Sequence, residues 1–423
     1  MPFDSPPPAQ QLGSTSGAIA VIDLDAIAHN VRRLHKASGP ADVMAVVKAD
    51  AYGHGMVPVA RTALDAGASW LGVASVEEAL ALRGAGIDAP LLAWLAVPGA
   101  PLAQAIRAGI DLSAPSTFAL RNIEDAVRAT GRSARVHLEL DSGMGRGGCT
   151  PARWDDLVST ARGLEAAGAL QVVGLWSHLA CADMPDHPSV AAQTQVFTEA
   201  IERASAGGLR PELLHLANSA ATLTRPHTHF DLVRPGLSLV GVSPGSQLGT
   251  AADFGLVPAM TLQSKLAQVK RVSAGQGVSY GHLYVTERET TLGLVPIGYA
   301  DGIPRNATNV GPVQIAASRW RVAGRVCMDQ FMVDLGDAAA SEGDPVLIFG
   351  PGTTGEPTVS DWADASGTIP NEILTRIGPR VPRVYVGNSA RNAAGNSLGN
   401  PAGNTAGNTA GNAAGSVRPP EGT

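Results

Sequence analysis

A lysine at the end of an apolar run is the residue of this chain whose position best predicts covalent chemistry. Residues 45–47 are Ala-Val-Val, Lys48 follows them, and Tyr52 and two glycines come shortly afterwards. This order predicts a buried strand that carries an amine to its carboxyl end, where α/β proteins place their chemistry. A partly desolvated lysine has a lowered pKa and can form a Schiff base with an aldehyde. From this string alone, a surface lysine just past a strand remains the alternative.

Other short strings with chemically active side chains follow along the chain. They are DSGMGRGG at 141–148, SHLACAD at 177–183, ANSAA at 217–221, VRPGL at 233–237, VSYG at 278–281, PIGYADG at 296–302 and RVCMDQ at 325–330. Each string alone is a weak signal. Arg234 alone predicts a surface or ion-pair residue, His178 a satisfied core histidine, and Tyr280 a turn or core tyrosine.

The elements that must position these residues alternate between strand and helix over residues 17–245. Apolar runs predict strands at 43–49, 70–74, 90–95, 111–114, 134–140, 172–178, 213–217 and 232–240. Helical patterns separate them, for instance at 57–67 and 75–86, and both of these end at glycine. Eight β/α units over roughly 200 residues favour an α/β fold, a TIM (β/α)8 barrel, with a doubly wound open sheet as the alternative.

The pattern changes to short β-rich runs in residues 246–387. Runs at 260–271, 290–296, 312–315, 324–335 and 344–349 predict a C-terminal, mostly-β domain. We expect residues 19–22 to add a strand to this domain. Residues 1–16 and 388–423 have the composition of disordered tails, and the second is a low-complexity segment rich in Gly, Asn and Ala. Removal of the second tail is expected to leave activity intact.

Composition limits the possible partners and the location. The net charge of −6 argues against nucleic acid or an anionic membrane as the main partner. The sequence has no apolar run of membrane-spanning length, and residues 1–17 lack the basic and apolar segments of a signal peptide. The three cysteines are widely spaced and have no metal-binding or disulfide pattern. We therefore expect a cytoplasmic protein without a metal site.

Taken together and in this order, the strings are specific, and the chain resembles the alanine racemases. The string around Lys48 is similar to the family's lysine motif for pyridoxal 5′-phosphate (PLP), and the other strings follow it over residues 17–387. The resemblance implies a PLP-binding barrel and a C-terminal β-domain in a head-to-tail homodimer with shared active sites. It implies an isomerase that interconverts L-alanine and D-alanine and supplies D-alanine for peptidoglycan.

The resemblance also implies roles for the matching residues. Lys48 holds PLP and acts as the base on one face of the substrate, and Tyr280 of the partner subunit is the base on the opposite face. Arg234 stays protonated, so the pyridine nitrogen that it contacts is an unprotonated acceptor. The other cofactor contacts are Tyr52, His178, Asn218, Ser219, Gly236 and Leu237. The substrate carboxylate is contacted by Arg146 and by the backbone N–H of Met328, with supporting residues Glu139, Asp329, Tyr299 and Cys327.

Three positions depart from the family pattern. Glu139 stands where many relatives have a carbamylated lysine, and we expect its carboxylate to supply the same negative charge beside Arg146. Pro379 stands where many relatives have a phosphate-binding tyrosine, which predicts one phosphate hydrogen bond fewer and weaker retention of PLP. Residues 239–240 replace a more usual aromatic, which changes the packing near the cofactor rather than the chemistry.

Alternative functions differ in what they require of the sequence. A broad-specificity or serine-preferring racemase would use the same machinery, because a methylene or hydroxyl shifts preference by only about 1–3 kcal/mol. A non-catalytic PLP-carrier barrel would end after one barrel, whereas this chain continues to Tyr280 and Met328. A barrel decarboxylase would keep an acid in place of Arg234. A zinc-dependent aldolase or dehydratase would need a late His/Cys pair, but no Cys follows Cys327 and no His follows His282.

Overall fold

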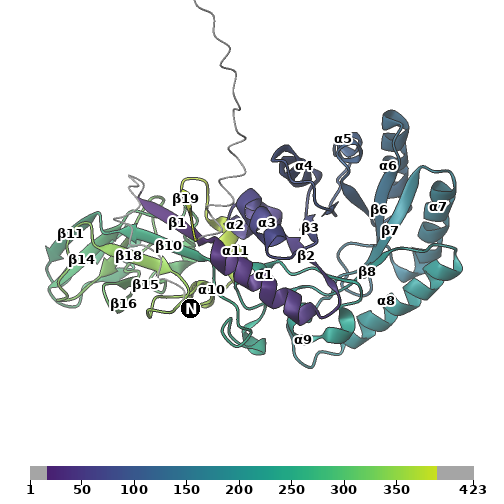
Figure 1. Ribbon diagram of the computed structural model, residues 1–423. Coiled ribbons are helices and arrows are strands. Elements are labelled where there is room, and N and C mark those ends of the chain that lie inside the picture. Colours follow the sequence, from purple (N-terminus) through teal and green to yellow (C-terminus); the bar gives the residue numbers. More distant parts are fainter. Residues whose placement is uncertain (1–16, 388–423) are drawn as a thin grey trace, which may run out of the picture.

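The chain folds into a barrel and an adjoining mostly-β domain that lie side by side (Figure 1). The computed structural model describes residues 17–387. Eight parallel strands form the barrel in the order β8-β7-β6-β5-β4-β3-β2-β9. Their bounds are β2 (Asp42–Val46), β3 (Trp70–Val73), β4 (Leu91–Ala93), β5 (Asp111–Ala114), β6 (Ala134–Glu139), β7 (Leu170–Trp176), β8 (Leu213–His215) and β9 (Leu232–Val233).

Backbone hydrogen bonds between β8 and β9 nearly close this sheet on itself. The N–H of Asp231 donates to Leu214 at 3.0 Å, and that of Arg234 donates to Ala217 at 2.9 Å. The predicted TIM barrel is confirmed, and the open doubly wound sheet is wrong. Most strands end one or two residues before the predicted bound, and two end still earlier, at Val46 and Val233, because the chain turns into the functional loops there.

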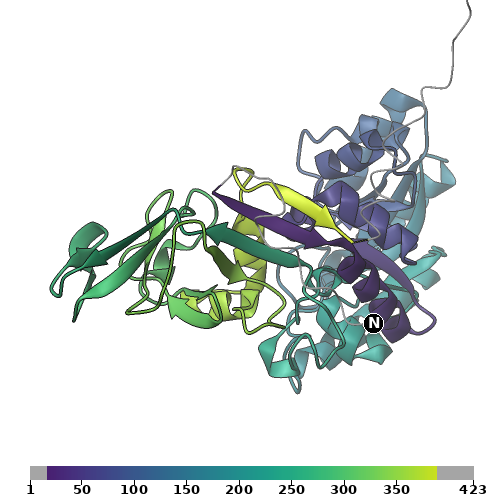
Figure 2. The ribbon, with the colours of Figure 1, turned by 60° about the vertical axis from the view of Figure 1, so that its left-hand side comes forward.

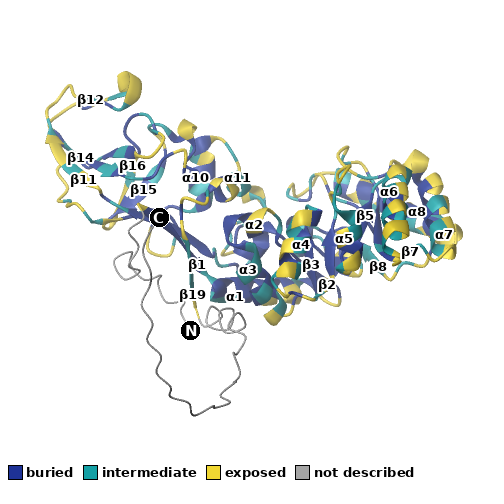
Figure 3. Cartoon of the chain, turned by 90° about the horizontal axis from the view of Figure 1, so that it is seen from above, coloured by how far each residue is buried: buried dark blue, intermediate teal, exposed yellow. Residues whose placement is uncertain are grey.

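Helices cover the outside of the barrel, with their exposed residues facing away from the strands (Figure 3). Local capping defines several of their starts: Ser75 and Glu78 form a capping box, and the Asn218 side chain accepts from the N–H of Ala221. The helices are α1 (Leu24–Ser38), α2 (Lys48–Gly53), α3 (Met56–Asp65), α4 (Val76–Gly84), α5 (Leu102–Arg107), α6 (Thr117–Thr130), α7 (Trp154–Ala166), α8 (Ser189–Ala206) and α9 (Ser219–Thr224).

The interior of the barrel has an apolar part and a polar part. Met44, Trp70 and Leu92, from the consecutive strands β2 to β4, pack together in one apolar cluster. On β5 and β6, successive strand residues face opposite sides of the sheet. On these two strands the alternate positions include buried polar residues, namely Asp111, Ser113, His137 and Glu139. The sequence therefore places polar side chains inside the barrel, from Asp111 at the amino end of β5 to Glu139 at the carboxyl end of β6.

The C-terminal domain contains a six-stranded sheet in the order β16-β15-β18-β10-β1-β19, a three-stranded sheet β11-β14-β17 and the hairpin β12-β13. As expected for residues 19–22, β1 belongs here: it pairs antiparallel with β10 and parallel with β19. Figure 2 shows β1 in purple beside β19 in yellow. The bounds are β1 (Ala18–Asp23), β10 (Met260–Lys265), β11 (Gln268–Val272), β12 (Gly277–Val278), β13 (Tyr284–Val285), β14 (Thr290–Val295), β15 (Pro312–Ile315), β16 (Ser318–Arg321), β17 (Phe331–Asp334), β18 (Pro345–Phe349) and β19 (Arg383–Val386).

Two helices, α10 (Val359–Ser366) and α11 (Pro370–Arg376), complete this domain and pack against each other. The predicted tails, 1–16 and 388–423, lie outside the described residues. Within residues 17–387, no helix combines the length and the apolar character needed to cross a membrane.

Candidate active site

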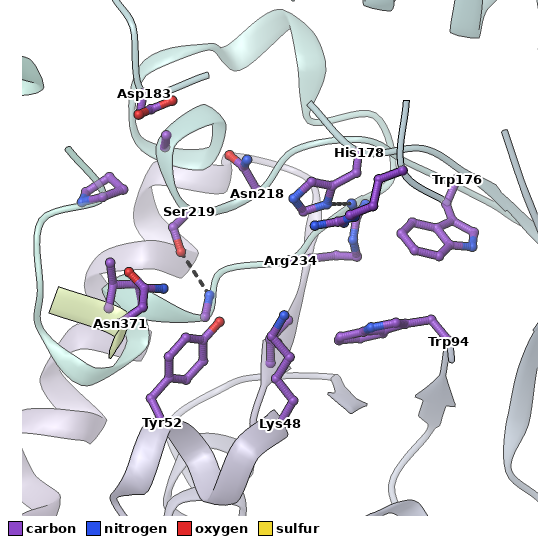
Figure 4. Close-up of a pocket in the computed structure, with 16 residues that line it drawn as sticks. Lys48, Tyr52, Trp94, Trp176, His178, Asp183, Asn218, Ser219, Arg234 and Asn371 are labelled. Carbon is purple, nitrogen blue, oxygen red and sulfur yellow. Dashed lines mark hydrogen bonds between the residues drawn. The ribbon is translucent and has the colours of Figure 1, made fainter. Parts of the chain in front are cut away.

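A cavity of about 300 Å³ opens at the carboxyl ends of the barrel strands (Figure 4). Its walls come from the loops after several strands, which is where a TIM barrel assembles its functional groups. The lining includes nine residues that the sequence singled out: Lys48, Tyr52, Arg146, His178, Asn218, Ser219, Arg234, Gly236 and Leu237.

Lys48 is followed by a left-handed turn that the sequence did not predict. Residues 49–52 all have φ between 51° and 55°, a conformation that costs an L-residue about 1–2 kcal/mol. Two carboxylates hold the turn: Glu78 accepts from the N–H of Ala49 at 2.7 Å, and Asp50 accepts from that of Met56 at 2.7 Å. Strain of this kind persists where the surroundings fix a functional geometry. The turn brings Lys48 and Tyr52 to the same wall.

The amine of Lys48 lies in an electropositive and partly desolvated environment. Burial lowers its pKa, and the charges of Arg146 and Arg234 lower it further. The Nζ atom lies 5.7 Å from the centroid of the Trp94 ring. Since a lowered pKa increases the fraction of free amine, the site favours nucleophilic and basic roles for this lysine.

Arg234 is buried at the end of β9 and is held by several acceptors. Its Nη2 donates to the carbonyl of Ser177 at 2.7 Å and lies 3.3 Å from His178 Nδ1. Its Nη1 lies 3.2 Å from Nδ1 of His215. Burial lowers the pKa of Arg234 to about 9, so the guanidinium is still charged at neutral pH. Burial, followed by the charge of Arg234, holds the pKa of both histidines well below 6.5, and they are neutral acceptors.

Hydroxyl and backbone groups form another corner of the cavity. The Ser219 hydroxyl accepts from the N–H of Gly236 at 2.9 Å and from that of Ser238 at 3.4 Å. A Cβ atom on Gly236 would lie 2.2 Å from the Tyr52 hydroxyl, so this close approach requires glycine. Burial raises the pKa of Tyr52 to about 12, which keeps its hydroxyl protonated and able to donate.

Glu139 lies beneath the loop that carries Arg146. The side chain of Asp141 organises this loop by accepting from the N–H groups of residues 143, 144 and 145 at 2.9–3.1 Å. Glu139 is 9% exposed, and a Cβ on Gly147 would lie 2.9 Å from its Oε1. Burial raises the pKa of Glu139 to about 7, although the charges of Arg146 and Arg234 oppose this rise. The carboxyl group therefore titrates near neutral pH.

The remaining predicted residues lie on the C-terminal domain rather than in the cavity walls of their own chain. Tyr280 is 70% exposed, Met328 53% and Tyr299 43%. Tyr280 follows β12, at the end of the domain that lies far from the barrel (Figure 3). Arg380 forms ion pairs with Asp329 at 2.8 Å and with Asp301 at 3.0 Å. Cys327 Sγ lies 3.2 Å from Ser279 Oγ, next to Tyr280.

The cavity also contains residues that the sequence analysis missed. Trp94 and Trp176 line it, and the end-of-strand rule that selected Lys48 would have found both. The C-terminal domain contributes Asn371, for which no local signal exists. The expectation at Pro379 is wrong in position: this residue lines a separate cleft beside α2, so it is not where a phosphate ligand has been lost.

The fold and the cavity together define a class, an α/β barrel whose cavity at the carboxyl ends of the strands contains a partly desolvated amine. The family model for the alanine racemase N-terminal domain matches residues 22–244, and that for the alanine racemase C-terminal domain matches residues 259–385. The chain belongs to the alanine racemase family. It is therefore an isomerase, a racemase of amino acids.

Individual relatives are similar to this chain over nearly their whole length. The alanine racemase of Frankia casuarinae is 56% identical over 381 residues, which is 89% of this chain and 99% of that protein. The crystal structure of the enzyme from D-cycloserine-producing Streptomyces lavendulae has a TM-score of 0.88 at 55% identity, covering 89% of this chain and 98% of that one. The Bacillus anthracis alanine racemase with bound L-Ala-P has a TM-score of 0.81 at 34% identity, covering 89% and 96%.

Proposed function

We propose that this chain racemises alanine with PLP bound in the cavity at the top of the barrel and with two bases, Lys48 and Tyr280 of the partner subunit. The observation that carries the proposal is the separation of the two residues. Lys48 lines the cavity, whereas Tyr280 of the same chain is 70% exposed on the other domain. Racemisation removes a proton from one face of a carbon and returns one to the other, which requires a base on each face.

The cavity fits PLP at both ends. The Ser219 hydroxyl, the Tyr52 hydroxyl and the close approach at Gly236 form a polar corner suited to a phosphate, with Asn218 and Leu237 beside it. Arg234, whose Nη2 lies 3.3 Å from His178 Nδ1, lies at the opposite end of the cavity, and Lys48 lies between Arg234 and the polar corner (Figure 4). When bound, PLP supplies the electron sink that stabilises the carbanion left by removal of the α-proton.

The residues of the chain then have separate tasks. Lys48 holds the cofactor through its amine and, once free, takes or returns the α-proton on its own face, helped by its lowered pKa. Arg234 can only donate, so it keeps the ring nitrogen of the cofactor as an acceptor. Arg146 binds the substrate carboxylate, and Glu139 supplies the anion that orients Arg146 in place of a carbamylated lysine.

A homodimer with shared active sites is part of the proposal. Large exposed apolar side chains accompany the second base on the C-terminal domain, namely Leu283, Val285, Tyr299 and Met328. Contacts of Cys327 with Ser279 and with the N–H of Tyr299 bring their segments together. A single chain rarely leaves such a group in water unless it contacts a partner. On the partner's barrel this surface would bring Tyr280 and the backbone N–H of Met328 to the cavity, with Asp329, Tyr299 and Cys327 behind them. All three cysteines are free, which supports a cytoplasmic location.

The proposal is tested by racemase assays on the purified protein with PLP, in both directions. Lys48→Ala and Tyr280→Phe should abolish interconversion of L-alanine and D-alanine. Tyr284→Phe, which removes a phenol that donates to Asp334 at 2.7 Å, is the matched control and should remain active. Full activity in both directions for both site variants would contradict the two-base assignment. Growth of a D-alanine-requiring bacterium on expression of the chain would support the peptidoglycan role.

A serine-preferring racemase is the second candidate, and the carboxamide of Asn371 in the cavity wall favours it. An amide can donate to and accept from a substrate hydroxyl, whereas the methyl group of alanine gains nothing from it. The ratio of kcat/KM for L-serine and L-alanine decides between the two. Asn371→Ala should lower this ratio if the amide recognises serine, and an unchanged ratio would exclude that role.

A further inference from the structure

Three buried polar side chains beneath Arg234 have no task in the mechanism above. Asp111, His137 and His215 come from β5, β6 and β8, and each is at most 2% exposed. They connect to Arg234 in a row. Arg234 Nη1 lies 3.2 Å from His215 Nδ1, His215 Nε2 lies 2.9 Å from His137 Nδ1, and His137 Nε2 lies 3.3 Å from Asp111 Oδ2.

The row ends at the opposite mouth of the barrel. There the Nε of Arg135 donates to the other carboxylate oxygen of Asp111 at 2.9 Å. The Arg135 side chain is 41% exposed, whereas that of Asp111 is buried. The row therefore runs from a solvent-facing cation, through a buried anion and two imidazoles, to the arginine of the cavity.

The hydrogen bonds of this row have only one consistent direction. Arginine donates and cannot accept, so Nδ1 of His215 must be unprotonated. Burial and the charge of Arg234 hold the pKa of His215 far below its usual value, so the ring is neutral and its proton is on Nε2. That proton is donated to His137 Nδ1. His137 then carries its own proton on Nε2 and donates it to the Asp111 carboxylate.

Packing holds both imidazole rings in this orientation. The Trp176 ring stacks on His215 with centroids 5.9 Å apart and an interplanar angle of 4°. The rings of Trp70 and His137 form a T-shaped contact, with centroids 5.6 Å apart and an interplanar angle of 77°. A Cβ on Gly174 would lie 2.4 Å from His137 Nδ1, so glycine is required to make room for the ring. The interior of the barrel is thus shaped around two fixed imidazoles.

We propose that Asp111 and His137 are positioning residues for Arg234, because their anion-anchored chain of hydrogen bonds makes His215 present an acceptor to the guanidinium at all times. With the opposite direction, Nδ1–H of His215 would face an N–H of Arg234. Two donors repel, and the guanidinium would turn away from its place at the cofactor ring. The inference rests on the proposed role of Arg234 toward PLP.

An isosteric substitution reverses the chain. In Asp111→Asn, Arg135 still donates, so the amide oxygen must face Arg135 and the NH2 group must face His137. His137 Nε2 then becomes an acceptor, both imidazole protons move to Nδ1, and His215 meets Arg234 donor to donor. In the double variant Asp111→Asn/Arg135→Met the amide is free to turn its oxygen to His137, which restores the original direction. Arg135→Met alone keeps the carboxylate and is the matched control.

The experiment measures kcat, KM and PLP retention for these variants as holoenzymes, together with ring 15N NMR of histidine-labelled protein. Asp111→Asn should lower kcat roughly tenfold and weaken PLP retention at an unchanged KM for alanine. Arg135→Met and the double variant should stay within about twofold of wild type. A double variant as impaired as Asp111→Asn, or an Asp111→Asn enzyme with wild-type kcat, overturns the proposal.

The NMR measurement also tests the proposal if Asp111→Asn does not fold. In the wild-type holoenzyme, His137 and His215 should both be neutral with the proton on Nε2, and a proton on Nδ1 of either ring overturns the inference. An inactive wild-type protein with these tautomers would instead refute the proposed function and leave the hydrogen-bond chain intact. The two failures are therefore distinguishable.

Discussion

Replacing Glu139 with glutamine should make the protein more stable at alkaline pH and less active. Glu139 is a buried carboxyl group whose pKa is raised from 4.5 to about 7, chiefly by burial. The difference corresponds to about 3 kcal/mol of unfavourable free energy for the buried anion. The fold tolerates this loss of stability, and the proposed function of the buried carboxylate is to orient Arg146.

The sign of the pH effect follows from the direction of the pKa change. Between about pH 4.5 and 7 the folded chain retains a proton that the unfolded chain has lost. Below about pH 4.5 the Glu139 carboxyl is uncharged in both states and does not reduce the free energy of unfolding. As the pH rises from about 4.5 to 7, the free energy of unfolding decreases, and above pH 7 this effect is constant. Glu139→Gln has no such dependence, so its stability relative to wild type should rise by up to about 3 kcal/mol between pH 4.5 and pH 8.

The assay is thermal unfolding of wild type and variant across this pH range at one protein concentration, with racemase kinetics in the same buffers. Activity of Glu139→Gln should fall roughly tenfold, because an uncharged amide holds a guanidinium less firmly than a carboxylate does. The acidic limb of the wild-type rate profile should be absent from the variant. Glu199→Gln, the same change on an exposed residue of α8, is the control. Wild-type activity together with an unchanged pH profile in Glu139→Gln would refute the reasoning.

Two further substitutions test the cavity and the turn after the lysine. Gly236→Ala should release PLP much more readily, because the new Cβ would lie 2.2 Å from the Tyr52 hydroxyl. Gly84→Ala, whose Cβ would meet nothing within 4 Å, is its control, and cofactor absorbance after gel filtration is the measurement. Ala49→Gly should raise stability by about 1 kcal/mol, because glycine adopts φ of +51° without strain. A lower melting temperature for this variant would show that the left-handed turn is not strained.

Local patterns in the sequence were sufficient for the alternating strands and helices and for part of the cavity, but they left an open sheet as the alternative to the barrel. The strands carry apolar runs separated by helical periodicity, and this signal does not depend on distant contacts. The carboxyl-end rule then selects Lys48, which directly follows such a run. The resemblance to a family added Arg234 and the roles of both residues, which spacing alone left open.

The features that escaped prediction depend on contacts between distant segments. Alanine and tyrosine have no preference for a left-handed turn, and the turn at 49–52 is held in part by Glu78 from another helix. Asn371 reaches the cavity only because the C-terminal domain packs on the barrel. The direction of the row from Arg234 to Asp111 likewise requires the packing of four separate strands.

The central claim is that each active site combines Lys48 of one subunit with Tyr280 of the other. The most direct measurement is the activity of mixed dimers formed from two inactive proteins, Lys48→Ala and Tyr280→Phe, after subunit exchange. In a mixed dimer one site contains both substitutions and the other contains neither. Random exchange of equal amounts should therefore restore about a quarter of wild-type activity. Verified subunit exchange with no recovery of activity would contradict the shared site.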